Sequence, residues 1–220
     1  MARRRRIPRD SFVERHAGKL FAGTVLAAVG LVVALGIRRR RRPRFVAPLI
    51  PARVTSGWGE PRPYRRGTHE GIDLLAPVGT PVVAVADGTV EKVVLDPCQA
   101  AGLHVIVLHD GAQAPGFRTS YLHLSRVDVE EGWRVAQGEQ LGLSGATGGA
   151  ATGPGCTFAD AAPHLHLTVS LRADLVSSGM PTGTARGDYV AVPAEAFIPA
   201  AYDPAVVARA EAAGIVIAVG

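Results

Sequence analysis

From Phe45 onward, the chain alternates short β-branched, apolar runs with Gly and Pro, and this punctuation restricts it to a fold built largely of strands. Residues 81–86 and 89–94 flank Asp87-Gly88, which predicts two strands joined by a hairpin turn. The same pattern predicts further strands over residues 103–109, 119–124 and 165–171. Strands at this close spacing, with turn signals between them, favour a β-sandwich or barrel.

Helical signals are few. Asp203 followed by Pro204 is typical of a helix N-terminus, and we expect one short helix over residues 204–213. Residues 144–163 and 173–192 are predicted to be long loops, because each contains clusters of Gly with Ala, Ser, Thr or Pro. Three aromatic side chains are expected in the core or along a groove wall: Trp58, Trp133 and Phe197.

The formal net charge of +5 conceals a strong asymmetry along the chain. Residues 1–44 carry 13 Lys and Arg against 2 Asp and Glu, whereas residues 45–220 carry 11 against 17. The β-rich part is therefore mildly acidic, and it lacks the basic face of a nucleic-acid-binding domain. We expect no nucleic-acid partner.

Residues 20–37 contain no charged side chain, and arginine clusters flank them at Arg3–Arg6 and Arg38–Arg42. An uncharged segment of 18 residues lies at the short end of the range for a transmembrane helix, and we expect it to anchor the protein in a membrane. The alternative is a signal peptide cleaved near Ala34-Leu35-Gly36, which the polar lead and the following arginines disfavour.

These patterns divide the chain into parts. They are a basic cytoplasmic arm (1–19), a transmembrane anchor (20–37), a linker (38–53), a β-rich domain (54–200) and a tail with a short helix (201–220). Cys98 and Cys156 both fall in loop-like sequence, which is consistent with an oxidising compartment. Whether they form a disulfide is left open, because pairing cannot be read from the sequence alone.

Two short stretches contain the residue types that bind a metal ion. His69 and Asp73 are four residues apart, and His164 and His166 are two apart, so the latter two face the same side of a strand. Imidazole nitrogens and a carboxylate oxygen are ligands that zinc prefers, and three protein ligands leave one position open for water. An open zinc position indicates hydrolysis. Either motif alone is weak evidence, because most histidines lie on the surface or have satisfied hydrogen bonds in the core.

The stretch from His69 to Asp73 is similar to the helical His-Glu-x-x-His zinc motif, in which the Glu is the general base. Gly71 and the downstream Pro77 make a helix unfavourable here. In an extended segment Glu70 points away from the side that His69 faces. We therefore expect Glu70 in solvent rather than in catalysis.

Further motifs follow one another along residues 54–171. In order they are Ser56-Gly57-Trp58-Gly59, His69-x-Gly71-x-Asp73, Ala76-Pro77-x-Gly79-Thr80-Pro81-Val82, Asp87-Gly88-x-Val90, Tyr121-x-His123-Leu124, Gly138-x-x-Leu141-Gly142 and His164-Leu165-His166. This succession resembles the lysostaphin-type zinc endopeptidases. The resemblance implies a mainly β fold, the duplicated hybrid motif, which is a β-sandwich with a groove. It also implies cleavage of peptide bonds in bacterial peptidoglycan by the domain at 54–200.

The resemblance also implies a role for each site residue. It makes His69, Asp73 and His166 the ligands of one Zn²⁺ ion, and it makes His123 and His164 the catalytic pair. Zinc polarises the scissile carbonyl and lowers the pKa of bound water, so the reaction needs a proton acceptor and donors for an oxyanion. Two imidazoles that are not ligands can supply both.

The two remaining histidines of this region, His104 and His109, are expected to be strand residues with satisfied hydrogen bonds. The expected peptidoglycan substrate places the peptidase domain on the cell-wall side of the membrane, with residues 20–37 as its anchor.

The chain departs from the family pattern in three places. An insertion over residues 146–163, which holds Cys156 and Phe158, precedes the His-x-His motif. Leu167-Thr168 follow His166, where an aromatic and an acidic residue are common, and the stretch 173–192 also looks inserted. These differences bear on groove shape and substrate choice rather than on the metal.

Two other functions fit parts of the sequence. The first alternative is a non-catalytic member of the same fold that activates or scaffolds another cell-wall hydrolase, although such a protein would be expected to lose ligands. The second is a biotinyl or lipoyl carrier domain, which needs a lysine at a hairpin tip. Lys92 is the only lysine after residue 44, and it lies inside a strand run.

Overall fold

The computed structural model describes residues 44–62, 67–111, 114–148, 155–158 and 162–218, which belong to a compact unit spanning Arg42–Gly220. Its strands are β1 (Arg53–Ser56), β2 (Ile72–Leu75), β3 (Pro81–Val83), β4 (Gly88–Val94), β5 (Leu103–His109), β6 (Phe117–Val127), β7 (Arg134–Val135), β8 (Gln140–Ser144), β9 (His164–Arg172), β10 (Ala185–Arg186), β11 (Tyr189–Val192) and β12 (Ala201–Tyr202). The helical elements are two 3₁₀ turns, η1 (Ala173–Leu175) and η2 (Ala194–Ala196), and the helix α2 (Pro204–Ala212).

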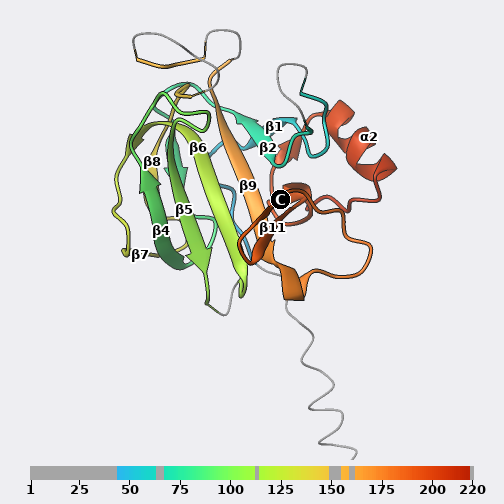
Figure 1. The fold of residues 1–220 in the computed structure, drawn as a ribbon. Coiled ribbons are helices and arrows are strands. Elements are labelled where there is room, and N and C mark those ends of the chain that lie inside the picture. Colours follow the sequence, from blue (N-terminus) through green and yellow to red (C-terminus); the bar gives the residue numbers. More distant parts are fainter. Residues whose placement is uncertain (1–43, 63–66, 112–113, 149–154, 159–161, 219–220) are drawn as a thin grey trace, which may run out of the picture. The chain divides into compact units, whose positions relative to one another are not determined.

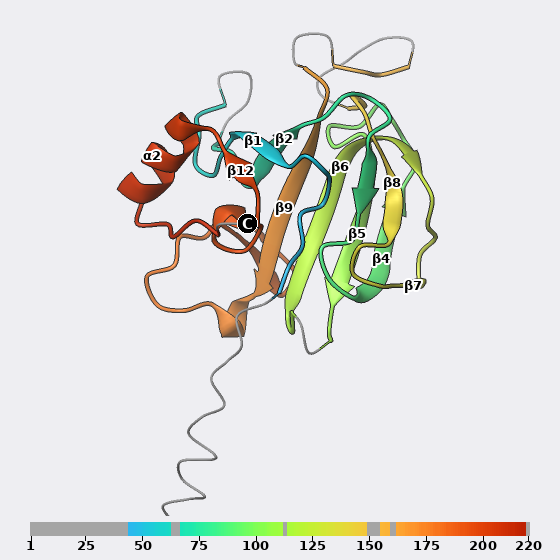
Figure 2. The same ribbon diagram turned by 180° about the vertical axis from the view of Figure 1, so that it is seen from behind.

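Hydrogen bonds join the strands into one 12-stranded sheet with the main order β12-β1-β2-β9-β6-β5-β4-β7. β8 branches from β6 to pair with β3, while β11 pairs with β9 and carries β10. The long strands β9, β6 and β5 lie side by side at the centre (Figure 1). Figure 2 shows β1 and β12 next to α2, on the other side of β9 from β5. The prediction of a mainly β fold is confirmed.

Alternating side chains of the central strands build the core. Val105 and Val107 of β5 and Tyr121 of β6 are fully buried, and the residues between them are more exposed, as expected for strands with one face packed inward. Phe45 and Leu49 also belong to the core cluster. Residues that we predicted to be a linker therefore contribute to the packing of the domain.

The hairpin predicted between residues 81–86 and 89–94 is wrong. β3 ends at Val83 and pairs with β8, whereas β4 pairs with β5 and β7. The three residues that follow β3 are all buried, and their backbone groups bond to other segments: Ala84 N–H donates to Glu139 O, and Val85 N–H donates to the Tyr121 hydroxyl. The apolar run at residues 84–86 therefore reflects a fully buried segment rather than a strand with alternating exposure.

The other predicted strands and the helix are confirmed. Residues 103–109 form β5, residues 119–124 lie within β6, and residues 165–171 lie within β9. α2 starts at Pro204, and the Asp203 carboxylate caps it by accepting a hydrogen bond from Ala205 N–H at 3.0 Å.

The prediction of a structureless loop over 173–192 is wrong for much of that segment. After η1, β10 and β11 form an antiparallel pair, and β11 adds to β9 from Tyr189 opposite Arg172 to Val192 opposite Val169. The Gly- and Ser-rich composition of this segment obscured the short apolar run at its end. Two buried residues of that run, Ala191 and Val192, are enough to add a strand to the edge of the sheet.

The large aromatic side chains differ in burial. Phe197 packs against the core cluster and Trp58 is partly buried. Trp133 is 48% exposed and lines a surface pocket with Val93 and Val127, so it is not a core residue. Cys98 and Cys156 form a disulfide with their Cα atoms 4.6 Å apart, which settles the pairing that the sequence left open.

Within the described ranges, none of the helices has the length and apolarity needed to cross a lipid bilayer. The anchor that we predicted over residues 20–37 falls outside the described residues.

Candidate metal centre

Two adjacent strands and the segment before them bring together the three predicted ligands. Asp73 lies on β2 and His166 lies directly opposite it on β9, while His69 immediately precedes β2. The same register places His164 opposite Leu75. Because the register is fixed by hydrogen bonds between β2 and β9, the carboxylate and the imidazole face each other without any contribution from a loop.

The ligand atoms of these residues converge on one point. One ligand atom from each of His69, Asp73 and His166 lies within 4.8 Å of the others. The Nε2 atom of His69 is 3.0 Å from Nδ1 of His166 and 3.1 Å from Oδ1 of Asp73. The remaining distance, from Nδ1 of His166 to Oδ1 of Asp73, is 2.8 Å. All three residues are buried.

Hydrogen bonds on the far side of each ring select the tautomer that binds a metal. Nδ1–H of His69 donates to the Gly57 carbonyl at 2.7 Å, which leaves the Nε2 lone pair directed at the site. The Thr168 hydroxyl lies 3.1 Å from Nε2 of His166 and can accept the hydrogen of Nε2–H. The lone pair of Nδ1 is then available to a metal ion. Partners of this kind hold a metal-binding histidine in orientation and raise its basicity.

Asp73 is divided between two tasks. Its Oδ2 atom accepts a charge-assisted hydrogen bond from Nη2 of Arg62 at 2.7 Å, and its Oδ1 atom faces the histidines. Burial alone would raise the pKa of Asp73. When no metal is bound, a proton on the facing nitrogen of either ring can bond to Oδ1, and these hydrogen bonds and the charges of His166 and His69 hold the pKa well below its usual value. The carboxylate is therefore ionised, as a metal ligand must be.

The close approach of β9 to Gly71 explains why the first motif has a glycine at this position. A Cβ atom at this position would lie 2.5 Å from the carbonyl oxygen of Leu167 and 2.8 Å from Nε2 of His166. Any side chain here would push β2 away from β9 and separate the ligands.

A turn over residues 56–60 carries the carbonyl that orients His69. The carboxylate of Glu60 accepts hydrogen bonds from Gly57 N–H at 2.8 Å and from the Ser56 hydroxyl at 3.0 Å. Glu195 of η2 reaches the same turn, because its Oε1 atom accepts a hydrogen bond from Trp58 N–H at 2.6 Å. These two carboxylates fix the turn, and the turn fixes the ring of His69.

The predicted catalytic pair lies beside the three ligands. The ring centroids of His123 and His164 are 5.0 Å apart, and the centroid of His123 is 6.0 Å from that of His166. Nε2 of His164 is 3.7 Å from Oδ1 of Asp73. Nδ1–H of His123 donates to the Thr147 carbonyl at 2.8 Å, so that the Nε2 atom of His123 keeps its lone pair.

His123 occupies a distorted position in β6. Its backbone has φ of 66°, in the left-handed region that residues other than Gly rarely adopt. The pairing of β6 shifts register next to it, between Leu124 and Arg126 opposite β8 and between the partners Leu103 and Val105 on β5. Irregularities of this kind re-aim a side chain, and a strained backbone costs about 1–3 kcal/mol.

The electrostatic surroundings keep His123 uncharged. Burial lowers the pKa of His123 to about 3, and the neighbouring rings of His166 and His164 act in the same direction. Burial also lowers the pKa of His166, although Asp73 opposes that effect. Both imidazoles therefore have a free lone pair at neutral pH.

Histidines and acids outside the site also have definite partners. The rings of His104 and His109 bond to carbonyls of Gly102 and Asp87, both at 2.9 Å, as predicted for strand residues. Glu70 is not simply solvated: its Oε1 atom accepts hydrogen bonds from the backbone N–H and the hydroxyl of Thr184, each at 2.7 Å. It ties the segment before β2 to the β10 region rather than to the site.

The structure thus brings together all five residues that the sequence analysis selected. It adds residues that the sequence analysis missed, namely Arg62, Glu60, Glu195 and Thr147. Proximity in sequence to the first motif could have drawn attention to Glu60 and Arg62. No local signal points to Glu195, because it lies 137 positions from Trp58.

The chain is similar in sequence to several known proteins. An uncharacterized metalloprotease of Haemophilus influenzae is 41% identical over 138 residues, which cover 63% of this chain and 25% of that protein. The peptidoglycan DD-endopeptidase ShyA of Vibrio cholerae is 36% identical over 114 residues, which cover 52% of this chain and 23% of that protein. The chain therefore matches about a quarter of the length of these relatives.

Solved structures are similar to part of the chain. A zinc-containing peptidase from Vibrio cholerae shares 33% sequence identity with a TM-score of 0.47, over 60% of this chain and 38% of that one. The catalytic domain of lysostaphin from Staphylococcus simulans shares 28% identity with a TM-score of 0.45, over 55% of this chain and 80% of that one. The model of peptidase family M23 matches residues 67–178, a range that holds the four histidines and the aspartate of the site. The chain belongs to peptidase family M23, in agreement with its resemblance to the lysostaphin-type enzymes.

Proposed function

We propose that this protein is a zinc-dependent endopeptidase that hydrolyses peptide bonds in bacterial peptidoglycan. The observation that carries the proposal is the convergence of Nε2 of His69, Oδ1 of Asp73 and Nδ1 of His166, with the rings of His123 and His164 beside them.

The donor set fits zinc. Two imidazole nitrogens and one carboxylate oxygen are available, each oriented by a partner on its far side, and such a set leaves a coordination position open for water. When bound, zinc acts as a Lewis acid on the scissile carbonyl and lowers the pKa of its water to about 7.

The residues of the chain have separate tasks in hydrolysis. His123 is neutral and its Nε2 atom faces away from Thr147, so this atom can accept the proton released by the attacking water. Nδ1–H of His164 donates to the Ala162 carbonyl at 2.9 Å, which fixes the His164 ring with Nε2 toward Asp73. Once protonated at Nε2, either ring can stabilise the oxyanion or deliver a proton to the leaving amine.

The substrate class rests on relatives. Three proteins of Vibrio cholerae that are named peptidoglycan DD-endopeptidases share 34–37% identity with this chain over 114–123 residues. The chain matches only about a quarter of each of these proteins, and the peptidase family model covers residues 67–178, which contain the candidate metal centre. This region supports peptide-bond hydrolysis in peptidoglycan as the activity, without specifying which bond is cut.

Digestion of purified peptidoglycan and of defined muropeptides, followed by mass analysis of the fragments, tests this function. We expect new peptide termini that carry one added water, and we expect the reaction to stop on chelation and to resume on addition of zinc. A folded, unchelated protein that contains no zinc would overturn the proposal. Stoichiometric zinc without hydrolysis would instead favour the scaffolding alternative.

The site also bears on location. We propose that the peptidase domain lies on the cell-wall side of a membrane and that residues 20–37 anchor it, because its proposed substrate is outside the cytoplasm. Added protease should degrade the domain on spheroplasts. Full protection of the domain until the membrane is broken would reverse the topology.

A further inference from the structure

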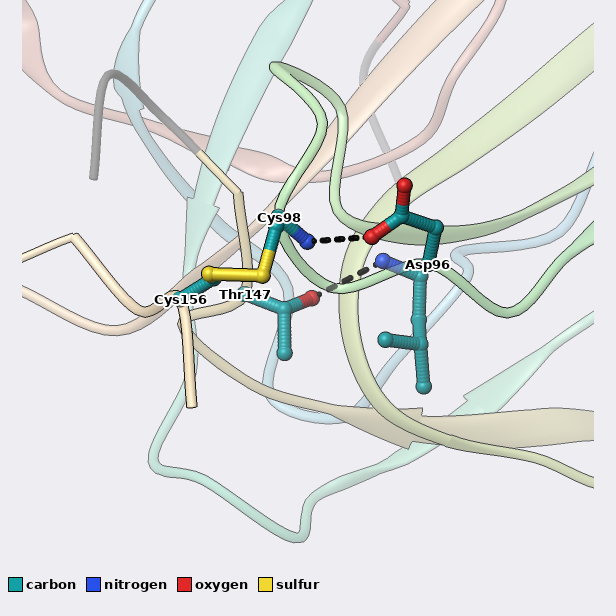
Figure 3. The surroundings of a disulfide bond; sticks show 5 residues. Asp96, Cys98, Thr147 and Cys156 are labelled. Atoms are coloured by element: carbon teal, nitrogen blue, oxygen red, sulfur yellow. Dashed lines mark hydrogen bonds between the residues drawn. A yellow bond between two sulfur atoms is a disulfide. The ribbon is translucent and has the colours of Figure 1, made fainter. Parts of the chain in front are cut away.

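Residues 155–158, which we call the strap, are the described middle part of the insertion that precedes β9. Cys156 is linked by its disulfide to Cys98, on the segment before β5, and Figure 3 shows this bond next to Thr147. Backbone hydrogen bonds hold the strap on the other side: Gly148 N–H donates to Cys156 O, and Phe158 N–H donates to Ala146 O, both at 2.9 Å. The strap therefore has a covalent attachment and a short β-like pairing.

The segments under the strap are packed backbone against backbone. A Cβ atom at Gly102 would lie 2.4 Å from the carbonyl of Thr147, and a Cβ atom at Gly148 would lie 2.5 Å from the nitrogen of Gly102. The backbone of Cys98 is fixed as well, because its N–H donates to the Asp96 carboxylate at 2.9 Å (Figure 3). The base to which the disulfide attaches the strap leaves little room for movement.

The strap ends on an aromatic ring that touches both predicted catalytic histidines. The centroid of the Phe158 ring is 5.0 Å from that of His164, with an interplanar angle of 31°. It is 5.2 Å from the centroid of His123, with an angle of 88°. These are the separations at which aromatic rings attract, the second in an edge-to-face arrangement.

The residue to which the strap pairs also acts on His123. Thr147 forms a bridge with Thr157, and the Thr147 carbonyl accepts the hydrogen bond from Nδ1 of His123. The hydroxyl of Thr147 accepts from Leu103 N–H at 3.0 Å and donates to the Leu124 carbonyl at 2.7 Å, which ties it to β5 and to the residue that follows His123 in β6. The strap thus reaches His123 by two routes, through the Phe158 ring and through Thr147.

We propose that Phe158 is a positioning residue for His123 and His164, and that the Cys98–Cys156 disulfide holds it in place. The ring packs one imidazole against the other and covers them from water on the side of the insertion, while leaving their Nε2 atoms to the reaction. The catalytic consequence of this role rests on the proposed function, whereas the placement of the ring does not.

Ring-current shifts test the placement without any need for activity. In the metal-free protein, the imidazole carbon-bound protons of His123 and His164 should resonate at positions displaced by the Phe158 ring. We expect Phe158→Ala to move both sets of resonances, and Phe158→Tyr to keep them near their original positions. Unchanged resonances in Phe158→Ala would overturn the contact.

Two further variants separate this effect from general disturbance. Trp133→Ala removes an aromatic ring that is 48% exposed and belongs to no part of the site, so it should leave the imidazole resonances in place. Cys98→Ser with Cys156→Ser should move the same resonances as Phe158→Ala, and adding Phe158→Ala to that pair should have little further effect. If removal of the disulfide and Phe158→Ala instead shifted the resonances by amounts that add up in the combined variant, the disulfide would not hold the ring.

Kinetics on muropeptides then test the consequence for catalysis. Misplacement of a catalytic group by about 1 Å can cost about 100-fold in rate, so we expect Phe158→Ala to lower kcat by up to that factor while zinc content stays stoichiometric. Phe158→Tyr should restore most of kcat. A normal kcat in Phe158→Ala with altered resonances would remove the catalytic role. If the wild-type protein does not hydrolyse muropeptides, the proposed function is refuted. The imidazole resonances still decide whether Phe158 lies against His123 and His164.

Discussion

Asp73 and Glu195 are two buried carboxylates whose surroundings shift their pKa values in opposite directions. Asp73 is surrounded by hydrogen-bond donors and imidazoles, which hold its pKa low despite burial. Burial raises the pKa of Glu195, and hydrogen bonds from backbone N–H groups, first that of Trp58, oppose this only in part. One carboxylate is prepared to bind a cation, and the other supports the turn next to His69 with its pKa raised above the ordinary value.

The raised pKa of Glu195 predicts a pH-dependent cost. As pH rises above the ordinary value of 4.5, the unfolded chain loses this proton before the folded one, so stability falls with pH by about 1.4 kcal/mol for each pH unit between the two pKa values. In E195Q this dependence should vanish. Urea unfolding of both proteins should therefore give a difference in unfolding free energy, variant minus wild type, that increases from pH 4.5 toward neutrality. A difference that is constant with pH would contradict the assignment.

The division of the site into ligands and catalysts predicts two distinct phenotypes. His123→Ala should keep stoichiometric zinc and lose about 10²- to 10⁴-fold in kcat, because it removes a general base but no ligand. Asp73→Ala should lose zinc and activity together. Metal analysis beside muropeptide kinetics checks this, and loss of zinc from His123→Ala would show that the two roles are wrongly divided.

The hydrogen bond between the Thr168 hydroxyl and His166 predicts an effect on metal affinity. Thr168→Val removes the hydroxyl that lies 3.1 Å from Nε2 of His166, and it should weaken zinc binding by about 10-fold or more. Thr168→Ser keeps the hydroxyl and serves as the matched control. Competition with a chelator gives the affinities, and equal affinities in the two variants would exclude a role for the hydroxyl.

At the level of elements, the sequence pattern identified strands better than their partners. β5, β6, β9 and α2 were predicted because alternation or a capping residue is a local property. The hairpin predicted after β3 was wrong, because Ala84–Ala86 are buried and bond to segments distant in the chain instead of pairing with β4. The site was predictable for a similar reason: the His-x-His spacing on β9 is local, whereas the contacts of Glu195 and Phe158 exist only in the fold.

The disulfide joins two elements across a separation of 58 residues, and its removal should destabilise the domain. The chain-entropy model gives about 4 kcal/mol for a loop of this length, with smaller values where the unfolded chain is already compact. Chemical unfolding of Cys98→Ser with Cys156→Ser, compared with wild type at equal zinc, measures the change. An unchanged unfolding midpoint would show that the bond serves the strap alone.

At the level of the whole molecule, the described domain draws its core from both ends of the compact unit. Phe45 and Leu49 pack in the same cluster as Ile198 and Val206. β12 pairs with β1 in parallel, and α2 follows it directly. The parts that we predicted to be a linker and a tail therefore help to hold the strand that leads into the turn at residues 56–60.

Because the zinc site requires the folded sheet, metal and stability should be linked. Free zinc at 100 times its dissociation constant should raise the unfolding free energy by about 2.7 kcal/mol relative to the metal-free protein. Thermal unfolding across a zinc titration measures this, and Asp73→Ala should show almost no response. A response in that variant equal to that of wild type would place the metal elsewhere.

The pairing of Asp73 with His166 makes the metal an indicator of correct folding. A slip of one residue between β2 and β9 would turn the carboxylate and the imidazole to opposite faces, and no zinc site would remain. A chain that mispairs these strands is then inert as well as misfolded. The three candidate ligands thus come together only after the sheet has assembled in the native alignment.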